Sequence, residues 1–171
     1  MRKLIQLMCV VALSTAYITV DAQTTVIGRL NTEIVIPITV VENEQLNFGR
    51  VISTGEGGMI LISPKSERLA TGNVRMLDDR FSAGKFLLSA APNSLVSVLL
   101  PQTPQKMFLN NSSHELSVDN FISDVPTGGY VFGNSKTNYE VSVGASLHVG
   151  NWSNNHAGVY SGTYEIVFTY N

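Results

Sequence analysis

The stretch that decides the fold is Gly158–Asn171, which reads G-V-Y-S-G-T-Y-E-I-V-F-T-Y-N. Its aromatic and aliphatic residues recur at every second position, which is the spacing that places side chains on one face of a β-strand. The residues of that face are Gly158, Tyr160, Gly162, Tyr164, Ile166, Phe168 and Tyr170. Because a long apolar strand has to be covered by other parts of a fold, this stretch predicts a protein organised around β-sheet.

The rest of the chain continues this pattern in short runs. Glu33–Val41 and Tyr139–Val149 alternate in the same way, and turn residues such as Gly55–Gly58 separate the runs. No segment keeps a period of 3.6 residues over ten or more positions. We therefore predict an all-β, antiparallel β-sandwich of about eight to ten short strands. Pro37 cannot donate to a sheet ladder, so Glu33–Val41 is predicted to be an edge strand or to switch partner there.

The first 22 residues carry the signature of a secretory signal peptide. Arg2 and Lys3 precede the apolar run Leu4–Ala16, and Val20-Asp21-Ala22 offers a cleavage site before Gln23. We expect residues 1–22 to be removed and residues 23–171 to form a single β-sandwich domain that is secreted, periplasmic or at the cell surface. Cys9 is the only cysteine, so the remaining chain has no disulfide to stabilise it.

The composition excludes several classes of partner. The formal net charge is −2, and no basic patch or stripe stands out, so we do not expect nucleic acid to bind. After the leader no apolar run approaches the length needed to cross a membrane, so no membrane-spanning segment is expected.

Residues that could carry catalysis or hold a metal are scattered. His114, His148 and His156 do not stand in a ligand pair, and Asp78-Asp79 is not part of a calcium-loop motif. No nucleophile elbow or phosphate-binding loop is present either. The sequence thus predicts no catalytic residue, no metal site, no cofactor and no enzymatic activity.

Trp152 is the only tryptophan, and it lies among the amides of Asn151–Asn155. An aromatic ring flanked by amides could stack on a sugar, and a second loop of this kind lies at Asn110–Ser113. The alternative is that Trp152 caps the core at its rim, because aromatic side chains bury large areas.

Several short motifs follow one another in a specific order over the chain. They are Leu46-Asn47-Phe48-Gly49, Gly57-Gly58, Ser63-Pro64, Gly72-Asn73-Val74, Pro92-Asn93, Val118–Phe121, Val141–Val149 and Ala157–Tyr164. In this order they resemble the bacterial family called domain of unknown function 4402. The resemblance implies an exported domain and no established activity.

A looser resemblance is to pilins of the chaperone–usher type and to spore-coat-U-like subunits. Gly158 stands fourteenth from the end and Tyr170 is penultimate, as in such pilins. This resemblance implies an incomplete immunoglobulin-like sandwich, completed by a strand from the N-terminal extension of a neighbouring subunit. Its implied partners are identical or related subunits and a periplasmic chaperone. The chain departs from such pilins by lacking their cysteine pair and by its short extension, Gln23–Thr32, in which Val26, Gly28 and Leu30 alternate.

Two functions of different classes follow. The first is an exported, non-enzymatic structural subunit, pilin-like or coat-like, that assembles by β-strand addition at the Gly158–Tyr170 face. The alternative is a self-complete secreted binding module, for example for a glycan, with Trp152 among its contacts. In that alternative the last strand pairs within its own chain, most simply with Glu33–Val41 or Tyr139–Val149. An enzyme is the weakest reading of the sequence.

Overall fold

A computed structural model describes residues 24–126, 128–133, 138–151 and 153–171. The predicted signal peptide and Trp152 lie outside the described residues. The chain divides into two units, Met1–Ile34 and Val35–Asn171. The described part of the first unit, residues 24–34, is exposed and belongs to no strand or helix.

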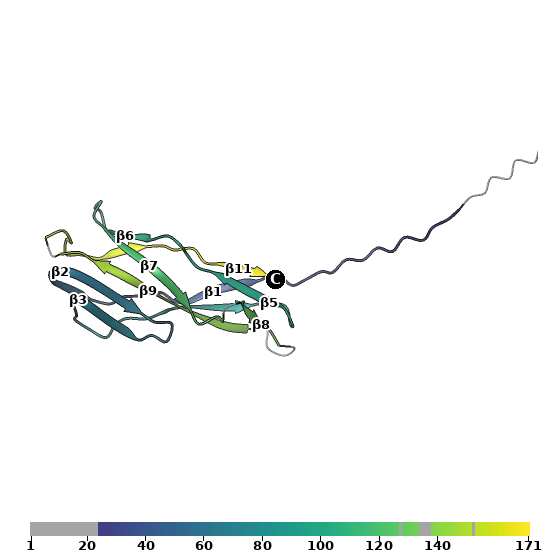
Figure 1. Ribbon diagram of the computed structural model, residues 1–171, viewed down its shortest axis with the longest axis horizontal. Helices are drawn as coiled ribbons and strands as arrows, with labels where there is room; N and C mark the ends of the chain where they lie inside the picture. Colours follow the sequence, from purple (N-terminus) through teal and green to yellow (C-terminus); the bar gives the residue numbers. More distant parts are fainter. Residues whose placement is uncertain (1–23, 127, 134–137, 152) are drawn as a thin grey trace, which may run out of the picture. The chain divides into compact units, whose positions relative to one another are not determined.

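The second unit consists of strands and connections, with no helix among its described residues. Its strands are β1 (Thr39–Glu44), β2 (Val51–Ile62), β3 (Arg68–Met76), β4 (Gly84–Ser89), β5 (Leu95–Leu99), β6 (Gln105–Leu109), β7 (Glu115–Ser123), β8 (Tyr130–Val131), β9 (Asn138–Val149), β10 (Tyr160–Gly162) and β11 (Val167–Tyr170) (Figure 1). All strand pairings are antiparallel. The predicted all-β, antiparallel, sandwich-like fold is therefore confirmed.

The strands form two sheets of unequal size. In the larger sheet the order is β1-β4-β9-β7-β6-β10, and the β2–β3 hairpin joins it through β9. The smaller sheet has the order β11-β5-β8. Strand β9 is the centre of the larger sheet, since it pairs with β2, β4 and β7 along different parts of its length. The predicted apolar residues Val141, Val143, Ala145, Leu147 and Val149 are buried, but Ser142, Gly144 and Ser146 between them are buried as well, so β9 is covered on both faces along its middle.

The apolar interior has two clusters. The first contains nine buried residues, among them Phe48, Ile60 and Leu147, with seven partly exposed apolar residues around it. The second contains six buried residues, among them Leu88 and Phe132, while eleven partly exposed apolar residues surround it. Within the described chain, the second cluster is thus the less completely covered one.

Two details of the sequence-based strand assignment were wrong. The first strand begins at Thr39 rather than at Glu33, because Pro37 has no N–H for the ladder. As predicted, it is an edge strand, since β4 is its only partner among the described strands. Gly55–Gly58 is not a turn, because β2 runs through it with an irregular register between Ser53 and Gly58.

Candidate functional site

The C-terminal stretch is an edge of both sheets. Strand β10 pairs with β6, with Gly162 opposite Met107, and β11 pairs with β5, with Phe168 opposite Val98. On their other side neither β10 nor β11 has a partner among the described residues. The predicted intrachain partners, Glu33–Val41 and Tyr139–Val149, were wrong. The strand is also not continuous, because residues 163–166 between its two parts are unpaired.

The main-chain N–H and C=O groups of every second residue point towards this free edge. The N–H of Asn110 donates to the carbonyl of Val159 at 3.0 Å, and the N–H of Asn171 donates to the carbonyl of Leu95 at 3.0 Å. In an antiparallel ladder both main-chain groups of a residue point to the same neighbouring strand. The N–H and C=O groups of the odd-numbered residues therefore point to β6 and β5. The even-numbered residues of β10 and β11 consequently present their N–H and C=O groups to the free edge.

The side chains of this stretch alternate as the sequence predicts. Tyr164, Ile166, Phe168 and Tyr170 pack against the second core cluster. The intervening residues, including Glu165 and Val167, are exposed. One face of the stretch thus covers the core and the other lies at the surface.

Tyr164 is half-buried at the break between β10 and β11. Its ring packs against Phe121 with centroids 5.1 Å apart and meets Phe86 edge-on at 6.4 Å. The hydroxyl is buried and has no hydrogen-bond partner among the described residues. Burial, and secondarily the negative charge of Glu42, raises the pKa of Tyr164 to about 12.

The hydroxyl of Tyr170 makes two hydrogen bonds to other segments of the chain. It accepts a hydrogen bond from the N–H of Ala91 at 3.0 Å and donates one to the carbonyl of Ile36 at 2.6 Å. The hydroxyl therefore joins the last strand to the segment that precedes β1.

Two glycines permit the close approach of this stretch to β6. Gly158 has a φ of +154°, and a Cβ at that position would lie 2.4 Å from a methyl group of Leu109. A Cβ on Gly162 would lie 2.4 Å from the carbonyl oxygen of Lys106. At Gly162 the conflict is with the main chain, so this position is glycine for a steric reason, whereas at Gly158 the nearest atom is the end of a side chain that can move.

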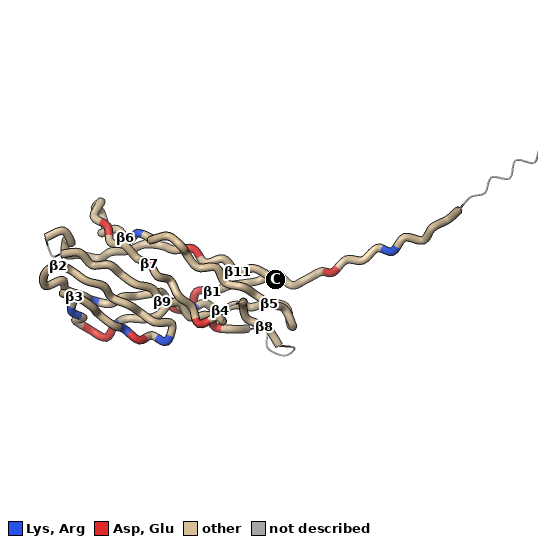
Figure 2. The backbone as a smooth tube through the Cα atoms, viewed as in Figure 1, with Lys and Arg blue, Asp and Glu red and all other residues tan. Residues whose placement is uncertain are grey.

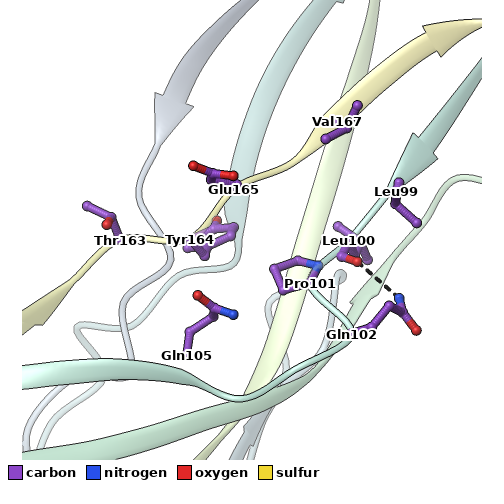
Figure 3. A pocket seen from close by; sticks show the side chains of 9 residues that line it. All are labelled: Leu99, Leu100, Pro101, Gln102, Gln105, Thr163, Tyr164, Glu165 and Val167. Carbon is purple, nitrogen blue, oxygen red and sulfur yellow. Dashed lines mark hydrogen bonds between the residues drawn. The ribbon is translucent and has the colours of Figure 1, made fainter.

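A cavity of about 400 Å³ opens where the ladder is interrupted. It is lined by Leu99, Leu100, Pro101, Gln102, Gln105, Thr163, Tyr164, Glu165 and Val167 (Figure 3). The amide nitrogen of Gln102 donates to the carbonyl of Leu100, and that of Gln105 donates to the carbonyl of Thr103. Glu165 is the only charged residue that lines the cavity.

The two Asn-rich loops meet at another place on the same unit. Besides the bond from Asn110 to Val159, the Ser161 hydroxyl donates to the Asn110 side chain at 3.2 Å. The rings of His114 and His156 stack with centroids 3.6 Å apart. The structure thus brings the ends of the two Asn-rich loops together, and Trp152 itself lies outside the described residues.

The other residues that could take part in catalysis or metal binding do not form one site among the described residues. Nε2 of His148 lies 2.8 Å from Oδ1 of Asp119 on the exposed face of the larger sheet. The N–H of Arg50 donates to the carboxylate of Asp78 and the side chain of Arg80 pairs with it, and both interactions lower the pKa of Asp78. Among the described residues no group of three or more His, Cys, Asp or Glu side chains could hold a metal ion.

Two further observations concern the distribution of charged residues and the length of apolar helices. Acidic and basic residues are intermingled near β3 (Figure 2). In the part of the chain that the structure describes, no helix is long and apolar enough to span a membrane.

Sequence reasoning missed two features of the site: the change of partner between β10 and β11, and the position of Glu165 at the cavity. One signal was available, because Glu165 is the only charged residue in Gly158–Asn171.

The fold and this edge define a class of protein, an antiparallel β-sandwich with one-sided pairing of its last strand. The model of a family described as Domain of unknown function (DUF4402) matches residues 38–170, and the chain belongs to that family. No curated protein and no solved structure matches the chain.

Proposed function

We propose that the protein is an exported, non-enzymatic structural subunit of a pilin-like or coat-like surface assembly, joined to its neighbours by β-strand addition. The observation that carries this proposal is the one-sided pairing of β10 and β11. An unpaired edge offers main-chain donors and acceptors to a strand of another chain, and natural proteins normally protect such edges.

The incompletely covered second cluster supports the same proposal. Ile166, Phe168 and Tyr170 of the edge strand belong to its partly exposed margin. A strand added along this edge would place alternate side chains over that margin, so it would bury apolar surface as well as complete the ladder.

Residues 24–34 are the segment that we propose as the added strand. Three of their even-numbered residues, Val26, Leu30 and Ile34, are aliphatic, and their side chains are 83%, 99% and 93% exposed. Because these three residues share one parity, they would lie on one face of an extended strand and could be covered together by a sheet edge.

The test is the association state of the chain from Gln23 onward, measured by light scattering over a range of concentrations. We expect concentration-dependent oligomers, and we expect that replacing residues 24–34 with a Gly-Ser segment of equal length abolishes them without changing the circular dichroism or the melting temperature. A monomer at all concentrations, or association that persists in the replaced variant, would contradict the proposal.

A glycan-binding module is the second candidate, favoured by the meeting of the two Asn-rich loops. Asn110, His114 and His156 place amide and imidazole groups together there. A glycan array should then give a signal that Trp152→Ala and Asn110→Ala weaken. An array without signal, or with signal unchanged in both variants, would count against this function.

A further inference from the structure

We propose that residues 25–34 of a second copy of this chain add to the free edge antiparallel to residues 160–169, in the register that places Arg29 opposite Glu165. This inference rests on the proposed function and adds to it the direction and the register of the contact. The evidence is the charge of Arg29 and Glu165 and the match between the side chains of residues 25–34 and those of residues 160–169.

The first argument is charge complementarity. Arg29 is the only cation in residues 24–38, and Glu165 is the only charged residue in Gly158–Asn171. Both are exposed, and no basic side chain within the described residues 35–171 forms an ion pair with Glu165. The cavity next to Glu165 adds an aliphatic wall that includes Leu99, Leu100 and Val167, which suits the hydrocarbon stem of an arginine.

The second argument is the match along the exposed face in this register. Opposite residues of neighbouring strands share a face of the sheet. The register pairs Ile27 with Val167 and Asn31 with Thr163, so an aliphatic residue meets an aliphatic one and a polar residue meets a polar one. In the parallel arrangement with the same ion pair, Ile27 would face Thr163 and Asn31 would face Val167, which mismatches both positions.

The third argument is the match on the covered face. In the same register Val26 lies opposite Phe168 and Leu30 opposite Tyr164, so the exposed aliphatic side chains cover the open margin of the second cluster. Shifting the antiparallel register by two residues keeps these parities but places Glu165 opposite Ile27 or Asn31. The ion pair therefore selects one register among those that the apolar pattern allows.

The fourth argument comes from the ladder itself. Even-numbered residues of β10 and β11 direct their main-chain groups to the free edge, so the added strand would bond through its own even-numbered residues. Pro37 is odd-numbered and falls outside this bonded set. Arg29 and Glu165 would then be a non-hydrogen-bonded pair, in which side chains approach most closely.

Cysteine cross-linking between two differently substituted copies tests the register. In a Cys9→Ser background, Ile27→Cys mixed with Val167→Cys should give a disulfide-linked dimer under mild oxidation, because Cα atoms of such a pair are about 4.5 Å apart and a disulfide accepts about 4.4–6.8 Å. Ile27→Cys mixed with Thr163→Cys is the matched control and should not cross-link.

Charge reversal is the second readout. Arg29→Glu and Glu165→Arg should each weaken association roughly two- to fivefold, and the two changes together should restore it, as expected for one cross-strand ion pair. Glu56→Arg makes the same charge change at an exposed position away from this edge and should leave association unchanged.

The outcomes separate this inference from the proposed function. If the unsubstituted chain associates but only the Ile27–Thr163 pair cross-links, or neither pair does, the register is overturned while strand addition stands. If a chain carrying both Ile27→Cys and Val167→Cys closes on itself rather than with a second copy, the partner is overturned. If the unsubstituted chain stays monomeric, both proposals are overturned.

Discussion

Tyr164 and Tyr170 stand on the same face of the last stretch, but their hydroxyl groups have opposite environments. The hydroxyl of Tyr170 makes two hydrogen bonds, to Ala91 and to Ile36. The hydroxyl of Tyr164 is buried without a partner in the described chain, close to Gly84. A buried polar group without a hydrogen bond costs about 1–3 kcal/mol, so the two residues contribute to stability in opposite directions through the same functional group.

We therefore expect Tyr164→Phe to raise the free energy of unfolding and Tyr170→Phe to lower it. The gain at Tyr164 should be about 1 kcal/mol, since a buried, unpaired hydroxyl is removed while the ring and its contacts with Phe86 and Phe121 remain. The loss at Tyr170 should be about 1–2 kcal/mol. Urea denaturation of both variants at neutral pH measures the difference, and a loss of stability in Tyr164→Phe would contradict the expected sign.

Tyr164→Phe should also change how the free energy of unfolding depends on pH in the alkaline range. The pKa of Tyr164 is raised from 10.0 to about 12 in the folded chain, so above pH 10 the unfolded state loses its phenolic proton first. Ionisation of Tyr164 therefore leaves the free energy of unfolding unchanged below pH 10 and lowers it as the pH rises towards 12. Tyr164→Phe should lose less stability than the unsubstituted chain between pH 9 and pH 11, and parallel curves for the two proteins would contradict this.

For single residues, the sequence predicted which face of the strand each side chain occupies, but not whether its hydroxyl group is hydrogen-bonded. Alternation alone assigns Tyr164 and Tyr170 to the covered side. The partners of Tyr170 are 79 and 134 residues away along the chain, so only the tertiary structure decides that one hydroxyl is bonded and the other is not.

The last stretch, considered as an element, changes partners in the middle. Strand β10 belongs to the larger sheet and β11 to the smaller one. Residues 163–166 cross between them, and the cavity beside Glu165 lies at this crossing. The interruption thus follows from one strand serving two sheets.

Close packing of β10 on β6 gives a prediction for this element. Gly162→Ala should destabilise the fold by about 1–3 kcal/mol, because its Cβ would lie 2.4 Å from a main-chain oxygen and the two strands would have to separate. Gly133→Ala is the matched control, because a Cβ there meets nothing within 4 Å. Thermal unfolding compares them, and equal melting temperatures for the two variants would contradict the proposed close approach.

The extent of several elements could not be obtained from alternation. The pattern of Glu33–Val41 continues through Pro37, yet the ladder with β4 begins only at Thr39. Conversely, Gly55–Gly58 has the composition of a turn, but β2 accommodates it as an irregularity between two partners. Periodicity identifies which residues can pair, whereas the ladder's donors and local bulges decide which of them do.

The molecule as a whole has an uneven interior. The first cluster is formed mainly around β2 and β9 and has more buried than partly exposed members. The second cluster has fewer buried than partly exposed members, and β11 lies on its margin. Because cooperative stability follows buried apolar contacts, the two regions should differ in local stability.

Hydrogen exchange measured by mass spectrometry should resolve this difference. In dilute protein we expect peptides covering β11 and β8 to exchange faster than those covering β2 and the second half of β9. Raising the protein concentration until the chain associates should slow exchange in β10 and β11 specifically. Uniform protection across all strands in dilute protein would contradict the uneven interior.

The one-sided pairing of the last strand has a consequence for growth. A copy that gives a segment from one end of its chain and receives one along the other end makes a head-to-tail contact, in which donor and acceptor surfaces differ. Such contacts leave an open chain unless their rotation happens to close a ring. An assembly built this way would have polarity: one terminus would display an unfilled edge and the other an unused segment, so its length would be limited by whatever molecule fills the last edge.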